Sequence, residues 1–324
     1  MRASFLHRHS VCVLGASGHI GQPLSLALMQ SKYVTDLRLY DLVYATGVGV
    51  DLSHMPVSTR VRGYEPGSID KALKGADLVI NVAGLARKPG MVREDLFNTN
   101  ALTIEELTTE IAKHAPGAII GVIPNPLNSM MVVAAETLKR EKAYDPRKLF
   151  GIISLDAIRA SVFLGEITGK DPKTLEVPIL GGHSGRTMLP LLSIALGDEK
   201  ITNDQQELIT HRIRRGGDDV VKAKNGSGSC SLSMAFATLG WAEKVLRALD
   251  GEKGIVVSSI VDSPLMKPKL DLFGSPVELG REGVERVLPL PKMNAYEEEQ
   301  LDRCLPDLEM NYRKGYEYFH TCKH

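Results

Sequence analysis

Two short segments in the second half of the chain contain residues that could transfer a proton. His183 lies in the run Gly-Gly-His-Ser-Gly, and Asp156 and Arg159 lie in Leu-Asp-Ala-Ile-Arg. Histidine has a pKa near working pH, and a carboxylate on one ring nitrogen fixes its tautomer and favours its charged form. Residues three apart on a helix share a face. These residue types are compatible with an acid–base site beside a cation, but equally with an ordinary turn histidine and a surface ion pair.

A glycine-rich turn near the N-terminus has spacing suited to phosphate. Gly15, Gly18 and Gly21 follow the apolar run Val-Cys-Val-Leu and precede a helical pattern. Glycines let a backbone approach a pyrophosphate, and the start of a helix presents free N–H groups. Asp41 ends the next apolar run, where an acid would bind ribose hydroxyls and repel a 2′-phosphate. We therefore predict dinucleotide binding, with NAD preferred over NADP.

Apolar runs and helical patterns alternate through the first half of the chain. Continuous apolar strands between helices imply a parallel sheet that is covered on both faces. Together with the glycine turn, this predicts a doubly wound α/β domain of the Rossmann type. The predicted strands are 11–15, 37–41, 77–83 and 118–123, and the predicted helices are 20–30, 96–114 and 129–139.

The pattern changes near residue 150. Helices dominate from there on, at 156–168, 203–224, 232–249 and 294–319, with strand candidates at 177–180, 254–261 and 276–279. We predict an N-terminal Rossmann domain over residues 1–150 and an α+β substrate domain over residues 151–324. A tight interface between them would create a cleft.

The charge balance and cysteine usage exclude several classes of protein. The 324 residues carry 39 basic and 39 acidic side chains, which argues against nucleic acid as a partner. The densest basic cluster, residues 211–215, is expected to be a solvated helix turn. No apolar run could span a bilayer, so no membrane partner is expected. The four cysteines show no metal-binding or disulfide framework, so we predict no metal and a reducing compartment.

The first ten residues, MRASFLHRHS, are basic and contain no acid. Such a composition is typical of organellar transit peptides. The segment is short, however, and a frayed N-terminus would have the same composition.

Several motifs occur in the order and at the spacing typical of malate dehydrogenases, within the lactate/malate dehydrogenase group. They are GASGHIG from Gly15, LYDL from Leu39, DLSH from Asp51, AGLARKPGMVREDLFNTNA from Ala83, PNPLN from Pro124, LFGIISLDAIRA from Leu149, GGHSG from Gly181 and VVKAKNGSGSCSLSMA from Val220. The chain resembles this family almost throughout, in its mitochondrial-type branch, with trypanosomatid parasites as a candidate source. The resemblance implies NAD-dependent, reversible oxidation of malate to oxaloacetate. It also implies a homodimer, or alternatively a tetramer, in the mitochondrial matrix or, alternatively, the cytosol.

The resemblance implies a role for each residue at a matching position. His183 would be the proton donor and acceptor, Asp156 its orienting carboxylate, and Arg159 the ligand of the C1 carboxylate. Asn125 would contact both the substrate and the nicotinamide. The remaining cofactor contacts would be Gly15, Gly18, Gly21, Asp41, Ala83, Gly84, Asn100 and Met234.

Two further arginines carry the expectation of a dicarboxylate substrate. Arg87 and Arg93 lie in the loop 84–95, which in the family closes over the substrate. By resemblance, Arg87 would bind the second carboxylate and Arg93 would polarise the ketone. A substrate with two carboxylates needs a cation at each end, and the planar fork of arginine suits a carboxylate. Pyruvate should therefore be a poor substrate.

Five positions depart from the family pattern. Pro124 stands where threonine is usual, His19 replaces a small residue beside the pyrophosphate turn, Cys230 with Ser231 replaces Ala-Thr, and Arg186 follows the histidine turn. These changes leave the main residue set intact. They permit a paralogue with another 2-hydroxy acid substrate, or an NAD-binding subunit without turnover.

A short-chain dehydrogenase is a further alternative. Tyr144 and Lys148 have the Tyr-x-x-x-Lys spacing of that class, whose chemistry needs both side chains one helical turn apart. Pro146 between them argues against a helix.

Overall fold

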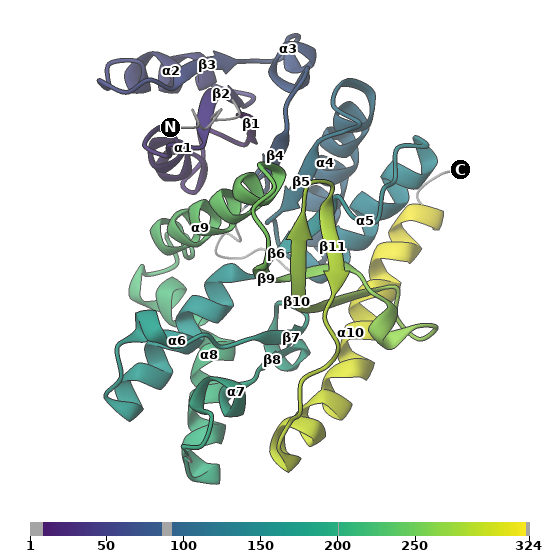
Figure 1. Ribbon diagram of the computed structural model, residues 1–324. Helices are drawn as coiled ribbons and strands as arrows, with labels where there is room; N and C mark the ends of the chain where they lie inside the picture. The colour runs from purple at the N-terminus through teal and green to yellow at the C-terminus, as the bar shows by residue number, and fades with distance from the viewer. Residues whose placement is uncertain (1–8, 86–92, 200, 322–324) are drawn as a thin grey trace.

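A computed structural model describes residues 9–85, 93–199 and 201–321 of the chain. Strands and helices alternate through its first half, as predicted (Figure 1). The strands are β1 (His9–Leu14), β2 (Val34–Tyr40), β3 (Arg60–Tyr64), β4 (Leu78–Asn81), β5 (Ile119–Val122) and β6 (Leu149–Ile152). The helices between them are α1 (Gly21–Met29), α2 (Ala45–Leu52), α3 (Ile69–Leu73), α4 (Arg93–His114) and α5 (Leu127–Arg140).

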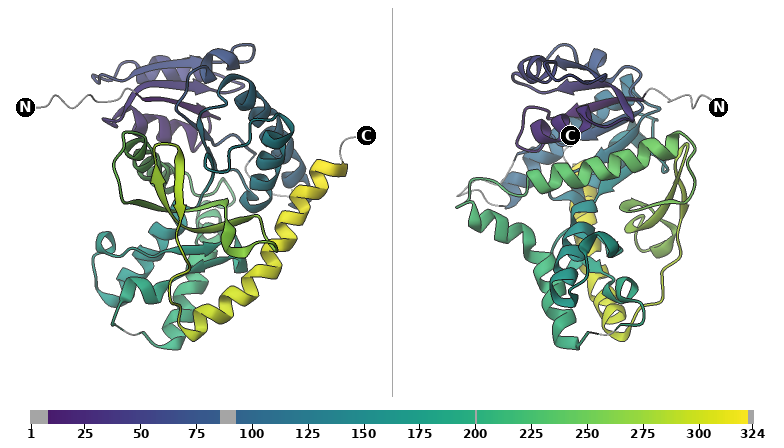
Figure 2. Two further views of the ribbon diagram at one scale, coloured as in Figure 1. Left: turned by 45° about the vertical axis from the view of Figure 1, so that its right-hand side comes forward. Right: turned by 60° about the vertical axis from the view of Figure 1, so that its left-hand side comes forward.

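The second half is richer in helices and its strands are antiparallel. Its helices are α6 (Ser154–Thr168), α7 (Leu192–Leu196), α8 (Asn203–Ala223), α9 (Leu232–Leu249) and α10 (Ala295–Thr321). Its strands are β7 (Ile179–Gly181), β8 (Met188–Pro190), β9 (Ile255–Asp262), β10 (Leu272–Gly280) and β11 (Gly283–Val287). Helix α10 runs along one side of the molecule and reaches the N-terminal part (Figure 2).

The predicted elements are all present, with ends that differ by a few residues. Sequence patterns missed the short elements α2, α3, β3, β6, α7, β8 and β11. Most of these span five residues or fewer, too short to establish a period. Strand β3 also lacks a buried face, because all five of its residues are at least partly exposed.

Within the described residues, eleven strands form one continuous sheet. Its order is β3-β2-β1-β4-β5-β6-β9-β10-β7-β8, with β11 paired to β10. The six strands from β3 to β6 are parallel, in the order of a dinucleotide-binding α/β fold. Strand β9 pairs with β6 in the antiparallel sense, so the second half extends the first sheet instead of building a separate one.

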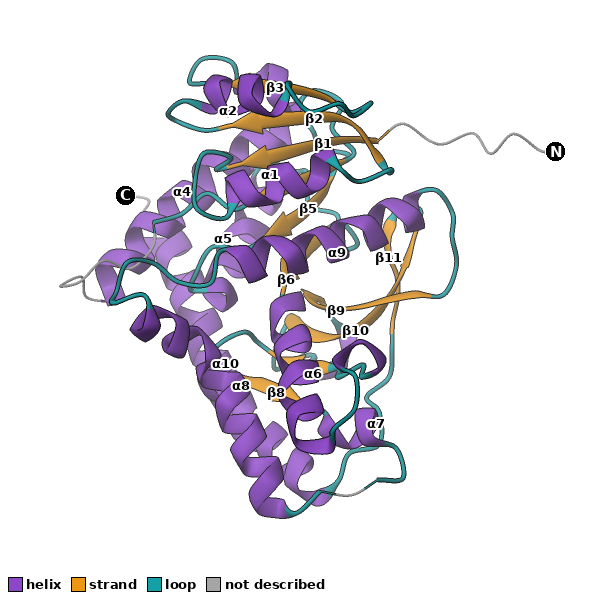
Figure 3. Cartoon of the chain, turned by 90° about the vertical axis from the view of Figure 1, so that its left-hand side faces the viewer, coloured by secondary structure: helices purple, strands orange, loops and turns teal. Residues whose placement is uncertain are grey.

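Alternate residues of β1 enter two different hydrophobic cores. Cys12 and Leu14 pack on the face covered by α4 and α5, whereas Val11 and Val13 pack on the face covered by α1 and α9. All four are fully buried, as the continuous apolar run predicts for a central parallel strand. Helix α9 lies beside α1 although about two hundred residues separate them (Figure 3). The two halves of the chain therefore contribute to both cores.

No helix among the described residues is long and apolar enough to cross a bilayer. The same part of the chain contains no group of three or more His, Cys, Asp and Glu side chains placed to hold a metal ion.

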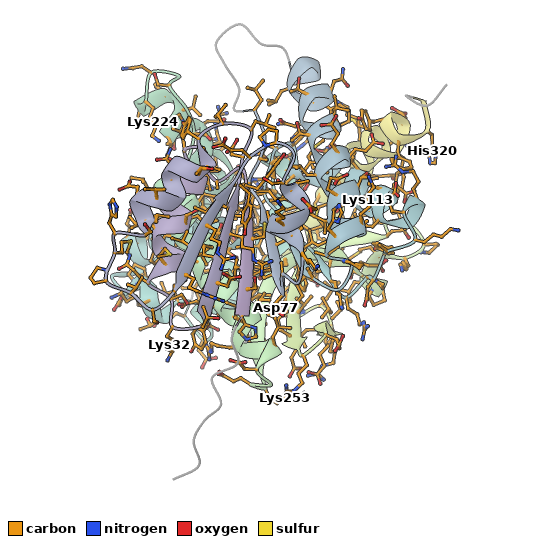
Figure 4. All side chains as sticks on the ribbon, turned by 90° about the horizontal axis from the view of Figure 1, so that it is seen from above. Lys32, Asp77, Lys113, Lys224, Lys253 and His320 are labelled. Carbon is orange, nitrogen blue, oxygen red and sulfur yellow. The ribbon has the colours of Figure 1, made fainter. Side chains whose placement is uncertain are left out.

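A buried histidine joins the two halves of the chain at the amino ends of the parallel strands. His9 at the start of β1 is 6% exposed, and its Nε2 lies 2.9 Å from Oδ1 of Asp250, which follows α9. Its Nδ1 lies 3.7 Å from Oδ2 of Asp77. Figure 4 labels Asp77 at one end of the strands, with Lys224 towards the opposite end of the molecule. Burial lowers the pKa of His9, whereas the hydrogen bonds to Asp77 and Asp250 and their negative charges raise it. Together these raising effects outweigh burial, so the pKa lies above its ordinary value.

This geometry makes stability depend on pH. Because the pKa of His9 is higher in the folded than in the unfolded state, its contribution is complete below the unfolded pKa and is lost as the pH rises through the folded pKa. The lowered pKa of Asp77 acts in a different, acidic range, where stability is lost as the pH falls.

We therefore expect the urea midpoint of the protein to fall as the pH rises above about 6.5, and the slope of this pH dependence to be smaller in His9→Gln. His54→Gln, which changes an exposed histidine, should retain the slope. If His9→Gln had the same slope as the wild type, the pH dependence of stability would not come from His9.

Candidate active site

The carboxyl ends of three neighbouring parallel strands bring the predicted nucleotide residues together. Leu14 at the end of β1 pairs with Tyr40 of β2 and with Asn81 of β4. The segments that follow these strands therefore emerge at one edge of the sheet, where ligands bind in folds of this kind. They contain the glycine turn from Gly15, then Asp41, and then Ala83 with Gly84.

The glycine turn is packed too closely for side chains at two of its positions. Gly15 has φ +87°, and a Cβ there would lie 2.6 Å from the backbone of Ala83. A Cβ on Gly21 would lie 2.1 Å from the carbonyl oxygen of Gly15. Gly18 is less constrained, because its Cβ would be in ordinary contact at 3.4 Å. The turn thus presents bare backbone at the start of α1, as a pyrophosphate site requires.

Asp41 fastens the glycine turn to the next strand. Its Oδ2 accepts a hydrogen bond of 2.8 Å from the backbone N–H of Ser17, and its Oδ1 accepts one of 2.7 Å from the N–H of Leu42. A carboxylate can accept about four hydrogen bonds. The partly exposed Asp41 therefore retains acceptor capacity for hydroxyl groups of a ligand.

Asn100 on α4 joins the loops that follow β4 and β5. Its Oδ1 accepts from the N–H of Leu85 at 2.7 Å, and its Nδ2 donates to the carbonyl oxygens of Leu85 and Asn125 at 3.2 and 2.7 Å. Asn125 itself is exposed. Its buried neighbour Pro124 packs against Gly84, where a Cβ would lie 2.9 Å from the proline ring. A proline at 124 is thus accommodated by a glycine in the facing loop.

The acid–base pair predicted from sequence is assembled from two separate elements. His183 follows β7, and Asp156 lies in the first turn of α6. Nδ1 of His183 lies 2.6 Å from Oδ2 of Asp156. The carboxylate is fully buried, whereas the imidazole is 21% exposed. With Nδ1 engaged, Nε2 is the ring nitrogen left for a ligand.

The environment of His183 favours its charged form. Burial lowers the pKa of the imidazole, while the negative charge and the hydrogen bond of Asp156 raise it. The positive charge of Arg159 lowers it slightly. The net effect is a pKa above the ordinary value, so the ring can carry a proton near neutral pH.

Arg159 completes the pair into a triad. Its Nη1 donates to Oδ1 of Asp156 at 3.2 Å, and its Nη2 lies 3.5 Å from Sγ of Cys230. Helix α8 gives it room, because a Cβ on Gly216 would lie 2.4 Å from Cδ and Nε of Arg159. Among the described residues these are its only hydrogen-bond partners, so further N–H groups remain for an anion.

Among the described residues, the remaining predicted side chains form no hydrogen bond or ion pair with His183, Asp156 or Arg159. Arg87 lies outside the described residues, as does the side chain of Arg93, whose backbone begins α4. Met234 is buried in α9. His19 is exposed, and Arg186 points away from the site in an ion pair with Asp307 at 2.9 Å.

The structure tests the sequence-based interpretation of two groups of polar side chains, the basic cluster 211–215 and the pair Tyr144 and Lys148. The cluster 211–215 is not a solvated turn throughout, because the partly buried Arg214 donates to the carbonyl oxygen of Met188 and to Gln300. Tyr144 and Lys148 do not lie on a helix. The phenol of Tyr144 donates to Asp262, and Lys148 donates to the carbonyl of Gly117, which removes the short-chain dehydrogenase alternative.

One polar residue beside the site is not among those predicted from the sequence. Asn128 on α5 is 1% exposed, and its Oδ1 accepts from the backbone N–H of His183 at 2.9 Å. It is the last residue of the motif PNPLN. The sequence therefore contained a signal, but nothing in it connected α5 with the turn after β7.

Models of known families match the chain in two consecutive parts. The NAD-binding domain of the lactate/malate dehydrogenases matches residues 9–151, and their alpha/beta C-terminal domain matches residues 153–319. The chain belongs to the lactate/malate dehydrogenase family. A mitochondrial malate dehydrogenase of Saccharomyces cerevisiae is 46% identical over 95% of this chain and 93% of its own length. The mitochondrial malate dehydrogenase of Homo sapiens is 42% identical over 97% of this chain and 92% of its own length.

Solved structures of this family have the same fold. A malate dehydrogenase of Cryptosporidium parvum superposes with a TM-score of 0.81 at 24% identity, covering 96% of this chain and 99% of its own. A lactate dehydrogenase of the same organism also superposes with 0.81, at 23% identity, covering 95% and 98%. The fold therefore does not distinguish a malate from a lactate site, and the side chains must.

The charge pair at the site makes a prediction about titration. In Asp156→Asn, burial and the nearby arginine still act on His183 while the negative charge is gone, so we expect the pKa of His183 to fall below its ordinary value. NMR of protein labelled at histidine Cε1 measures it directly. Glu110→Gln, which removes a partly exposed carboxylate beside His114, is the control and should leave His183 unchanged. An unaltered His183 titration in Asp156→Asn would contradict the pairing.

Proposed function

We propose that this protein is an NAD-dependent malate dehydrogenase that interconverts malate and oxaloacetate. The observation that carries the proposal is the triad of His183, Asp156 and Arg159. It places a proton-accepting imidazole beside a guanidinium with free N–H groups. Two relatives of this chain, from yeast and human, are named mitochondrial malate dehydrogenases and match the chain almost from end to end.

The nucleotide edge of the sheet fits NAD. Gly15 and Gly21 leave bare backbone where side chains would clash, and Asp41 has lone pairs for the ribose hydroxyls and a charge that opposes a 2′-phosphate. Gly18, Ala83, Gly84, Asn100, Asn125 and Met234 are proposed to complete the site, with residues 1–150 as the NAD-binding domain and 151–324 as the substrate domain. When bound, NAD supplies the acceptor for the hydrogen that leaves C2 of malate with its electron pair.

His183 is proposed to handle the proton of the reaction. During oxidation, Nε2 takes the proton of the C2 hydroxyl while the C–O bond becomes a carbonyl. In reduction, the same nitrogen returns it. Asp156 keeps the Nδ1 proton in place and stabilises the imidazolium that forms. Its complete burial makes that electrostatic effect stronger than it would be in water.

Three arginines are proposed to bind the dicarboxylate. Arg159 is ready for the C1 carboxylate, since Asp156 orients its guanidinium and part of its donor set remains free. Arg87 is proposed to bind the distal carboxylate and Arg93 to polarise the ketone, on the basis of the motif that contains them. Asn125 is exposed at the end of β5, where its amide would contact both ligands.

We further propose that the protein is a homodimer. Leu232 and Phe236 at the start of α9 are 73% and 65% exposed, and Val50 on α2 is 54% exposed. Leu232 and Phe236 are four residues apart, so they form an exposed apolar patch on one face of α9. Contiguous exposed apolar patches are typical of protein–protein contacts. A second copy is the occupant that the resemblance to this family suggests.

A mitochondrial location is proposed from the names of the relatives and from the basic, acid-free segment 1–10. Import of the full chain by isolated mitochondria tests it. Failure of import would favour the cytosol instead.

The substrate proposal predicts a selective enzyme. Purified protein should oxidise NADH rapidly with oxaloacetate, and slowly with pyruvate or phenylpyruvate at equal concentration. NADPH should be a poorer cofactor than NADH because of Asp41. Arg87→Gln should lower oxaloacetate turnover by about two orders of magnitude, since an unpaired distal carboxylate is costly in a closed site. Preference for a monocarboxylate, or NADH binding without turnover, would overturn the proposal.

The dimer proposal predicts a change in mass on charging the apolar patch. Sedimentation equilibrium should give twice the chain mass of 35.3 kDa, and Phe236→Glu should shift the protein towards the monomer. The control is Met310→Glu on α10. Met310 is likewise an exposed apolar residue, at 53%, but lies outside the patch, so this change should leave the mass unchanged. A monomeric wild-type protein at micromolar concentration would refute the dimer.

A further inference from the structure

We propose that Asn128 is the positioning residue of the proton-transfer histidine. This inference rests on the role proposed for His183. The backbone N–H of His183 donates to Oδ1 of Asn128 at 2.9 Å. Asp156 fixes the far end of the same residue through the ring. His183 thus has two anchors, one on α5 for its backbone and one on α6 for its imidazole.

Three other backbone N–H groups of the turn that carries His183 bond within the turn itself, while Cys304 and Asp307 of α10 contact the turn at Thr187 and Arg186. Gly182 N–H donates to the carbonyl of Thr187, Thr187 N–H donates to the carbonyl of Ser184, and Ser184 N–H donates to Oγ1 of Thr187. Among the described backbone N–H groups of this run, that of His183 alone bonds to a side chain of another element. The position of the turn relative to α5 therefore depends on Asn128.

The orientation of the Asn128 amide is determined by its neighbours. Its Nδ2 donates to Oγ1 of Thr187 at 3.1 Å and approaches Oδ1 of Asn311 on α10 at 3.5 Å. A flipped amide would place its NH2 group against the N–H of His183, which is also a donor. With a side chain that is 1% exposed, water could not compensate for that conflict. The acceptor must face His183.

Two close approaches keep Asn128 in this position. A Cβ on Gly182 would lie 2.5 Å from Oδ1 of Asn128 and 2.8 Å from Oγ1 of Thr187, so the amide contacts the bare backbone of the turn. On the other side α10 packs on α5, where a Cβ on Gly315 would lie 2.8 Å from the carbonyl of Ser129. The amide is enclosed between the catalytic turn and the C-terminal helix.

Loss of the Asn128 acceptor should misplace the imidazole without removing it. The ring would keep Asp156, so its pKa should stay close to that of the wild type. Its Nε2 would no longer meet the hydroxyl of malate at the right distance. Displacements of about 1 Å in a reacting group can lower rates about 100-fold. The effect should appear in kcat, while the binding of both ligands is largely retained.

The experiment compares four variants of the full chain in steady-state kinetics with oxaloacetate and NADH. Asn128→Ala should lower kcat at least about tenfold, with both KM values within about threefold of wild type and the pKa of the pH–rate profile unchanged. Asn128→Ser leaves a smaller cavity than alanine and places its hydroxyl out of reach, so it should show the same signature if the alanine variant does not fold. Ser129→Ala is the matched control. It removes a buried hydrogen bond of 2.7 Å from α5 to the carbonyl of Asn311 without touching the turn, and should keep wild-type kcat.

Three results would overturn or redirect the inference. Wild-type kcat in folded Asn128→Ala or Asn128→Ser would show that the contact does not position His183. An equal loss of kcat in Ser129→Ala would assign the effect to general packing between α5 and α10. The fourth variant, His183→Ala, separates the two proposals: full activity there would refute the proposed function, whereas its inactivity beside a normal Asn128→Ala would refute this inference alone.

Discussion

The buried carboxylate of Asp156 is the constraint around which the second half of the chain is arranged. A fully buried charge is tolerated only when it is paired and hydrogen-bonded, and here the two oxygens bind different partners, the imidazole of His183 and the guanidinium of Arg159. Removing one partner of a buried pair costs about 3–5 kcal/mol. The start of α6, the turn after β7 and the glycine of α8 that makes room for Arg159 are therefore coupled to one another. The electrostatic arrangement that stabilises the fold here is the same one that prepares an imidazole to exchange a proton.

A second constraint is the parallel register of the N-terminal strands. It brings the ends of β1, β2 and β4 to one edge, where the glycine turn, Asp41 and the segment 82–85 lie close together. The crowding at Gly15 and Gly21 shows why these two positions exclude side chains even without a ligand. Strand β5 ends at the same edge at Val122, and α5 begins after a short loop, at Leu127. That continuity connects the nucleotide edge to His183 through Asn128.

The departures from the family pattern have little effect on this arrangement. Pro124 packs against Gly84, and the carbonyl of Asn125 behind it still accepts from Asn100. Arg186 is drawn away by Asp307 on α10, and His19 is exposed to solvent. Cys230 alone enters the site, as a weak partner of Arg159. Each departure is thus either accommodated by a local neighbour or exposed to solvent, and none displaces His183, Asp156 or Arg159.

The sequence by itself determined the order of the longer elements, the glycine-rich turn after β1 and the family to which the chain belongs. These depend on local signals, namely apolar periodicity, glycine spacing and motifs that occupy short stretches. Only the tertiary structure decided which residues meet. It brought His183 to Asp156 from 27 positions away, extended the first sheet with strands of the second half, and placed Asn128 against the turn after β7. Such contacts are set by how helices pack on a shared sheet, and that packing depends on all of the cores together and not on any single segment.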